Sequence, residues 1–223
     1  HLAERDVPKA LSELYRVTRR SVFATIATRR DRDKTWHLTV KDRKWWEDRL
    51  FEAGFRKHPG TQQVIGYEAI EQQKLQITAA LQKIPPAVLE RYPLGCLQAE
   101  RDLHMDMLRE SGRRSDAHVA RYELVRLYAG PGDVVLDVSC GLGYGAAVLC
   151  HATGVQRVIG VDNSRFAVEY AKANYGRPLP TEFRLGDAAD LAFLEDNTID
   201  VVASLETLEH LPHPDKFLAE IGR

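Results

Sequence analysis

An apolar run that leads straight into a glycine-rich loop is the feature that most constrains the fold. Residues 133–138 are almost continuously apolar, and the loop after them carries Gly141, Gly143 and Gly145 before the helix-favouring letters AAVLCHA. Glycine allows a sharp turn and lets the backbone approach a ligand with no Cβ in the way. A helix N-terminus offers N–H groups to a carboxylate or phosphate. The pattern therefore predicts a strand, a tight ligand-binding loop and a helix.

The alternation of predicted strands and helices continues towards the C-terminus. Strands are predicted over 157–162, 181–187 and 199–206, with a helix near 164–174 between the first two. These strands are apolar without a regular polar alternation, which is typical of a parallel sheet covered by helices on both faces. The predicted fold class is therefore α/β with a Rossmann-like, mostly parallel sheet.

The first part of the chain shows different patterns. Two adjacent runs alternate apolar and polar residues as strands of an antiparallel hairpin do. The expected elements are a helix over 7–17, a strand over 21–28, a helix from Asp42 to Gly54, and hairpin strands over 61–69 and 74–83. Beyond Pro85 and Pro86, residues 95–111 and 115–128 predict two helices separated by a turn.

Three aspartates follow three of the predicted parallel strands. Asp137, Asp162 and Asp187 end successive strands, on the side of such a sheet where ligands bind. Asp137 can face a cationic ligand, Asp162 can accept both hydroxyls of a ribose, and Asp187 with the next backbone N–H can read an adenine edge. One acid at a strand end is commonly structural, whereas three in register favour a ligand site at this edge of the sheet.

Two other functions have to be weighed against this one. Gly141, Gly143 and Ala146 also satisfy the dinucleotide fingerprint, so a nicotinamide-dependent oxidoreductase is an alternative. The Gly186-Asp187-Ala188 element and the lack of a hydride-relay Tyr or Lys motif disfavour it. A non-catalytic cofactor-binding or interaction domain is the third hypothesis.

At these residues the sequence resembles the class I S-adenosylmethionine-dependent methyltransferases. VLDVSCGLGYG looks like the family's first motif, VIGVDNS the second, FRLGDAADLAF the third and IDVVASLETLEHL the fourth. The resemblance implies that the cofactor is S-adenosyl-L-methionine, with the glycine loop on its methionine part, Asp162 on its ribose, and Asp187 with Ala188 on its adenine. The cofactor-binding residues expected on this basis are Asp137, Cys140, Gly141, Gly143, Gly145, Asp162, Asn163, Asp187, Ala188, Tyr122 and Arg121.

Residues upstream and downstream of these motifs add to the expected site. His118, Arg121 and Tyr122 look like the H-x-x-R-Y helix that precedes the first motif in a subgroup of the family, although a plain amphipathic helix explains them equally well. Glu206 and His210 follow the fourth strand and are the candidate catalytic bases; His210 is preferred because its ordinary pKa lies near neutrality. Simple helix capping is the alternative for both.

The order of the segments departs from the family. Residues 1–84 resemble the C-terminal half of the fold (strands five to seven), and residues 85–223 resemble its N-terminal half with the cofactor site. The helix pattern K-x-L-x-E-x-x-R occurs from Lys9 and again from Lys216, and the sequence begins without Met. We therefore expect either a fragment of a tandem protein or one composite, permuted sheet, formed within one chain or in a homodimer by segment exchange.

Composition limits the partners. A net charge of −1 gives no general field for nucleic acid, and no apolar run is long enough to span a bilayer. Three unevenly spaced cysteines and the absence of His ligand spacings predict neither a disulfide framework nor a metal site, and favour a reducing, cytoplasmic location. The WHLTVK-x-x-x-WW segment is associated in the family with polysaccharide and secondary-metabolite pathways, so a small-molecule or glycan acceptor is expected.

Overall fold

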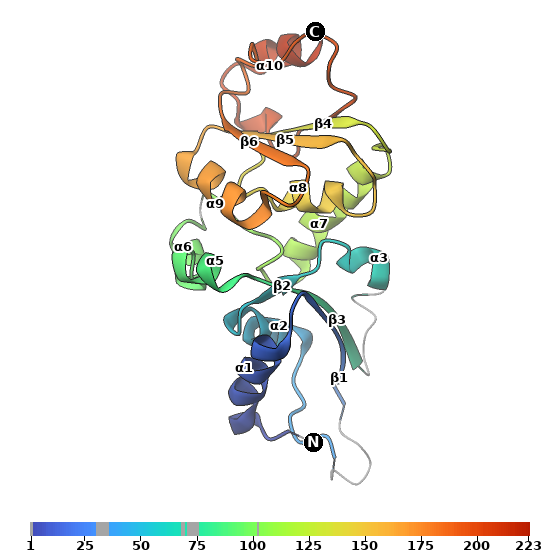
Figure 1. Ribbon diagram of the computed structural model, residues 1–223, viewed down its shortest axis with the longest axis vertical. Coiled ribbons are helices and arrows are strands. Elements are labelled where there is room, and N and C mark those ends of the chain that lie inside the picture. Colours follow the sequence, from blue (N-terminus) through green and yellow to red (C-terminus); the bar gives the residue numbers. More distant parts are fainter. Residues whose placement is uncertain (1, 30–35, 68–69, 71–75, 102) are drawn as a thin grey trace. The chain divides into compact units, whose positions relative to one another are not determined.

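The structure is a computed structural model that describes all residues except 1, 30–35, 68–69, 71–75 and 102 (Figure 1). The chain divides into two compact units, residues 1–98 with 107–120, and residues 99–106 with 121–223. The strands of the described residues form one antiparallel and one parallel sheet. Helices and strands thus follow the predicted change of pattern along the chain.

The first unit is built on an antiparallel sheet of three strands in the order β1-β3-β2. Apolar side chains of two helices pack on this sheet and form one core with it, which includes Val7, Trp46, Phe51, Phe55 and Ile77. The elements are η1 (Glu4–Asp6), α1 (Val7–Val17), β1 (Ser21–Ala27), α2 (Arg43–Glu52), β2 (Phe55–Lys57), α3 (Thr61–Ile65), β3 (Gln76–Lys83), α5 (Pro86–Arg91) and α6 (Leu94–Ala99).

Local sequence signals fixed several of these elements. Helix α1 covers the predicted residues, with Pro8 in its first turn. The Asp42 carboxylate caps α2 by accepting a hydrogen bond from Trp45 N at 2.8 Å, and Gly54 follows the helix at a φ of 101°.

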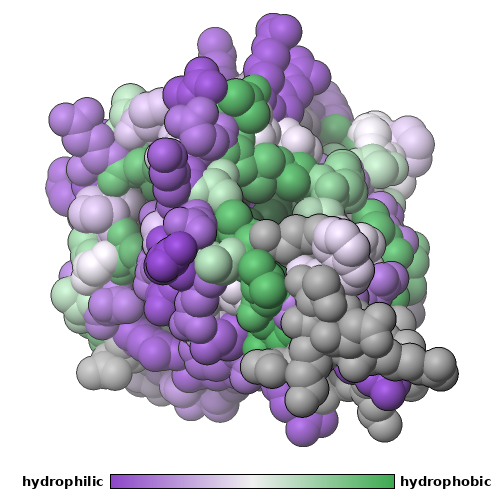
Figure 2. All heavy atoms as spheres, turned by 90° about the horizontal axis from the view of Figure 1, so that it is seen from below, coloured by the Kyte–Doolittle hydropathy of each residue, from purple (hydrophilic) through white to green (hydrophobic). Residues whose placement is uncertain are grey.

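Figure 2 views the molecule from below and shows apolar residues near the middle of that face, with polar residues around them.

Two predictions in this region were wrong. Residues 61–69 were expected to form a strand, but Thr61–Ile65 form α3, which ends at Gly66 with a φ of 74°. Strand β3 pairs instead with β2, a short strand that the sequence did not predict. The reason is burial. Strand β2 places Phe55 in the core, where it is completely buried, whereas the sequence of residues 61–69 alternates only weakly between apolar and polar side chains.

The helix predicted over 95–111 was also wrong beyond its first turns. It ends with α6, and the following described residues form turns. Polar side chains here are buried and bond to groups outside the segment: Asp106 accepts from Tyr170 and Tyr175, and Arg109 donates to Tyr92 O at 3.0 Å. Satisfying these buried groups takes precedence over a regular helix.

The second unit contains a parallel sheet of four strands in the order β6-β5-β4-β7. Figure 1 shows α8 and α9 on one side of this sheet and α10 on the other, and Phe217 of α10 lies in a core with Leu136, Val138, Ile159 and Val161. The elements are α7 (Arg113–Arg126, shared between the units), β4 (Val134–Val138), α8 (Tyr144–Cys150), β5 (Arg157–Asp162), α9 (Arg165–Tyr175), β6 (Thr181–Leu185), β7 (Val201–Ala203), η2 (Leu208–His210) and α10 (Pro214–Ile221).

This sheet confirms the predicted fold class. All pairings of β4 with β5 and β7, and of β5 with β6, are parallel, and both faces carry helices. An antiparallel sheet is also present, in the first unit. That the two segments are halves of related domains stays a prediction.

Candidate cofactor-binding site

The glycine loop between β4 and α8 is held in an unusual backbone conformation. Ser139, Gly141 and Gly143 have φ values of 58°, 52° and 78°, and Gly143 caps α8 in the left-handed region. A Cβ on Gly143 would lie 2.6 Å from Ala171 Cβ, so only glycine fits there. A Cβ on Gly141 would meet nothing within 4 Å. The loop is therefore packed tightly on its inner side and open at Gly141.

Asp162 ties this loop to the end of β5. Its Oδ2 atom accepts a hydrogen bond from Gly141 N at 2.8 Å, and its Oδ1 atom accepts one from Ser164 N at 2.9 Å. Ser164 in turn caps α9 by accepting from Ala167 N. Each carboxylate oxygen keeps a second lone pair, which leaves Asp162 able to accept from hydroxyl groups. Asn163, next to it, is exposed.

Asp137 lies near the end of β4, within hydrogen-bond distance of the Tyr122 hydroxyl. The Tyr122 hydroxyl donates to Asp137 Oδ1 at 3.1 Å, and the carboxylate is fully buried. Burial raises the pKa of Asp137 to about 7; the Tyr122 hydrogen bond opposes this shift and the charge of Asp162 adds to it. Gly145 explains why Tyr122 fits, because a Cβ there would lie 2.1 Å from the tyrosine ring.

Arg121, the neighbour of Tyr122 on α7, reaches a different strand end. Its guanidinium lies 2.9 Å from Glu206 Oε1, and Glu206 follows β7 with a φ of 56°. The two side chains are about half exposed, at 42% and 50%. Two consecutive helix residues thus contact the carboxyl ends of β4 and β7.

The remaining predicted residues lie at the same edge of the sheet or just after it. Asp187 is exposed after β6 and accepts from Ala189 N at 2.9 Å, and Ala188 is buried beside it. His210 is exposed at the end of η2, where its backbone N–H donates to Thr207 O. Both residues make these hydrogen bonds within their own loops.

Cys140 packs inside the loop. Its thiol is buried, and a Cβ on Gly160 would lie 2.9 Å from its sulfur. Burial, together with the charges of Asp137 and Asp162, raises the pKa of Cys140 well above its ordinary value. The thiol therefore stays protonated, as expected of a small packing residue rather than a nucleophile.

The sequence reading missed Tyr144, the first residue of α8. Its ring packs edge-on against Tyr122 with centroids 5.3 Å apart. Burial raises the pKa of Tyr144, and the nearby charges of Asp137, Asp106 and Glu206 raise it further, whereas Arg121 lowers it. The Tyr144 hydroxyl is therefore held in its neutral form. Its place between Gly143 and Gly145 was the signal that could have revealed it.

Across the described ranges, His, Cys, Asp and Glu side chains form no group of three or more that could hold a metal ion. Within the same part of the chain, none of the helices combines the length and apolar character that crossing a bilayer demands.

These features define an α/β protein with a candidate ligand site at the carboxyl ends of a parallel sheet, where a glycine loop and strand-end acids meet. Residues 136–223 match the family described as "Methyltransferase domain". The chain is 36% identical over 102 residues to an O-methyltransferase of Penicillium expansum, covering 44% of this chain and 36% of that protein.

Two mycobacterial proteins are also similar. Phthiotriol/phenolphthiotriol dimycocerosates methyltransferase of Mycobacterium tuberculosis (strain ATCC 25618 / H37Rv) is 33% identical over 126 residues, covering 56% of this chain and 46% of that protein. "Probable S-adenosylmethionine-dependent methyltransferase" of Mycolicibacterium smegmatis is 37% identical over 92 residues, 41% of this chain and 34% of that protein. Among solved structures, the PH0226 protein of Pyrococcus horikoshii OT3 has a TM-score of 0.46 at 26% identity, covering 56% of this chain and 59% of that chain.

The match over residues 136–223 and these relatives support a class I S-adenosylmethionine-dependent methyltransferase domain in this part of the chain. The chain spans less than half the length of the curated relatives given above.

Proposed function

We propose that the site binds S-adenosyl-L-methionine and that the chain is part of an enzyme that methylates a small-molecule or glycan acceptor. The observation that carries the proposal is the hydrogen bond from Gly141 N to Asp162 at 2.8 Å. This bond holds the open glycine loop next to a carboxylate that can accept hydrogen bonds from ribose hydroxyls, at one edge of the sheet. This pairing suits a ligand that joins a ribose to a polar, charged tail.

The residues present fit this cofactor. The open side of Gly141 admits a ligand next to the backbone, and Asp162 has lone pairs left for the two ribose hydroxyls. Asp187 and Ala188, after the neighbouring strand, would hold the adenine. Asp137 is buried with a pKa of about 7, so its ionised form would favour a cation above the loop through the field rather than by direct contact.

When bound, the cofactor supplies a methyl group on a positively charged sulfur. The chain's own residues contribute position and exclusion of water. Tyr122 and Tyr144 form a buried aromatic pair over the loop, and the Arg121–Glu206 ion pair fixes the end of β7. Glu206 is held by Arg121, so we assign proton removal from the acceptor to His210, which is exposed after β7.

Calorimetric titration with S-adenosylhomocysteine and, separately, with NADH tests the proposal. We expect heat of binding with S-adenosylhomocysteine and none with NADH. Asp162→Ala should abolish that heat, because it removes both the ribose acceptor and the support of Gly141 N. Asp196→Ala is the matched control, since Asp196 is an exposed carboxylate with only a 3.7 Å contact to Arg223.

Circular dichroism of each variant shows whether the fold is retained. Binding of NADH instead, or an unchanged affinity of a folded Asp162→Ala protein for S-adenosylhomocysteine, would contradict the proposal. Transfer of labelled methyl groups to fractions of a cell extract, compared between the wild type and His210→Gln, then tests the acceptor class and the proton acceptor.

A further inference from the structure

Strand β6 is the outer strand of the parallel sheet on the side away from β4. Within the described residues it pairs with β5 alone. Pro180 O accepts from Val158 N and Gly186 N donates to Asp162 O, so these two backbone groups point towards β5. Backbone groups of successive residues in a strand point to opposite sides. The N–H and C=O groups of Phe183 and Leu185 therefore point outward.

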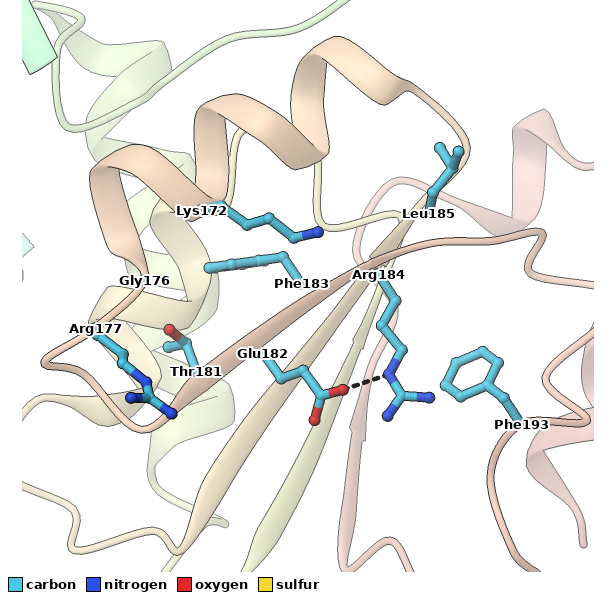
Figure 3. A pocket seen from close by; sticks show the side chains of 9 residues that line it. All are labelled: Lys172, Gly176, Arg177, Thr181, Glu182, Phe183, Arg184, Leu185 and Phe193. Atoms are coloured by element: carbon cyan, nitrogen blue, oxygen red, sulfur yellow. Dashed lines mark hydrogen bonds and ion pairs between the residues drawn. The ribbon is translucent and has the colours of Figure 1, made fainter.

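A groove runs along this outward edge (Figure 3). It is an open groove with a volume of about 730 Å³, lined by all five residues of β6, by the end of α9 and by Phe193. Figure 3 shows Lys172 and Phe183 on the α9 side of the strand, and Arg184 with Phe193 on the opposite side. A segment placed in the groove would meet side chains on both faces of the strand while its backbone faces β6.

The groove is positively charged and partly apolar. Lys172, Arg177 and Arg184 line it, against the single carboxylate of Glu182. That carboxylate is neutralised further, because it contacts both Arg184 and, at 3.3 Å, Arg157 of β5. Two apolar side chains, Leu185 and Phe193, are 50% and 39% exposed. An occupant with alternating acidic and apolar or hydroxyl side chains would match these features.

We propose that this groove binds an extended acidic segment of a partner protein, which adds to the sheet as a strand next to β6. The outward groups of Phe183 and Leu185 supply the backbone hydrogen bonds, and the exposed cations Lys172 and Arg177 select negative side chains. The proposal concerns a surface apart from the cofactor loop and does not depend on methyl transfer. A strand on this edge also covers the unpaired backbone groups that an exposed outer strand leaves open to aggregation.

A fluorescent peptide of alternating Glu and Thr is the probe, and fluorescence anisotropy measures its affinity for the whole chain. A proline peptide of equal charge, with two Pro residues between successive Glu residues, lacks N–H donors on both sides of the strand and cannot form a continuous ladder, and an oligothymidylate of equal charge represents nucleic acid. We expect the Glu-Thr peptide to bind, with an affinity that falls as salt rises, and the other two to bind at least about tenfold more weakly, a difference of roughly 1.4 kcal/mol.

Two variants and one control locate the binding. Lys172→Glu with Arg177→Glu reverses two exposed charges of the groove, and Leu185→Pro removes an outward N–H that β5 does not use. Each should weaken peptide binding about tenfold or more. Lys216→Glu, an exposed lysine on α10, should leave it unchanged. Circular dichroism and S-adenosylhomocysteine titration check that each variant is folded.

Hydrogen exchange provides a second measurement that needs no variant. Bound peptide should slow amide exchange at Phe183 and Leu185, where the new hydrogen bonds form. The proposal is overturned if the proline peptide or the oligothymidylate binds as tightly as the Glu-Thr peptide, or if no probe binds. It is equally overturned if binding is unaffected by the groove variants or leaves exchange at Phe183 and Leu185 unchanged.

Discussion

Replacing Gly145 with alanine tests the packing that builds the site. Gly145 lies inside α8 with ordinary helical geometry, so alanine alone should stabilise the helix by about 1 kcal/mol. The added Cβ, however, would lie 2.1 Å from Cζ of Tyr122. Displacing that ring costs about 1–3 kcal/mol of overpacking. Losing its hydrogen bond to the buried Asp137 costs about 1–3 kcal/mol more.

The expected result is a net destabilisation of about 3 kcal/mol, within a range of roughly 1–5 kcal/mol. Urea unfolding followed by fluorescence measures it, and S-adenosylhomocysteine titration measures the accompanying loss of affinity. Gly95→Ala is the matched control, because Gly95 is also helical and a Cβ there would meet nothing within 4 Å. That change should be neutral or stabilising by up to about 1 kcal/mol.

The double-mutant cycle with Tyr122→Ala decides whether the reasoning is correct. Once the ring is removed, Gly145→Ala has nothing to displace and should become neutral or stabilising. If Gly145→Ala destabilises the chain equally with and without the Tyr122 ring, the clash is not the cause and the packing argument fails.

Two further predictions concern buried carboxylates. Burial raises the pKa of Asp137 to about 7, so between pH 4 and 7 the Asp137 carboxyl is protonated in the folded chain and ionised in the unfolded chain. The stability that this proton contributes is therefore present at low pH and is lost as the pH rises through about 7. Asp137→Asn should flatten this part of the pH profile of the free energy of unfolding, and an unchanged profile would refute the assignment. For Asp116, burial opposes ionisation, but the hydrogen bond from Arg43 and the charge of Lys57 outweigh it and lower its pKa. The stability that the ionised Asp116 contributes is therefore present above about pH 4 and lost below it. At pH 7, Asp116→Ala should lower the free energy of unfolding in urea by about 3–5 kcal/mol. A loss under about 1 kcal/mol would show that the buried lysine and arginine need no partner.

Local signals in the sequence were sufficient for most regular elements. The α1 helix covers exactly the residues that its apolar spacing and Pro8 indicate, and β4, β5 and the glycine loop lie where predicted. The N-cap by Asp42 and the left-handed Gly54 were also readable, because both depend on neighbours within a few residues.

Where the sequence failed, distant contacts outweighed local preference. Strand β2 is three residues long and exists because it pairs with residues of β3 that lie 24 to 28 positions further along the chain. The turns before α7 follow from Asp106, whose carboxylate is enclosed by two tyrosines of α9. Neither partner can be read from the residues next to these segments.

The candidate site divides in the same way. The sequence by itself determined that strand-end acids and a glycine loop gather at one edge of a parallel sheet, because strand ends and loop glycines are local properties. Only the tertiary structure decided that Asp162 supports Gly141, that Tyr122 covers Asp137, and that Tyr144 joins them. The direction of a side chain and the burial of a charge depend on atoms from distant parts of the chain, which no local pattern specifies.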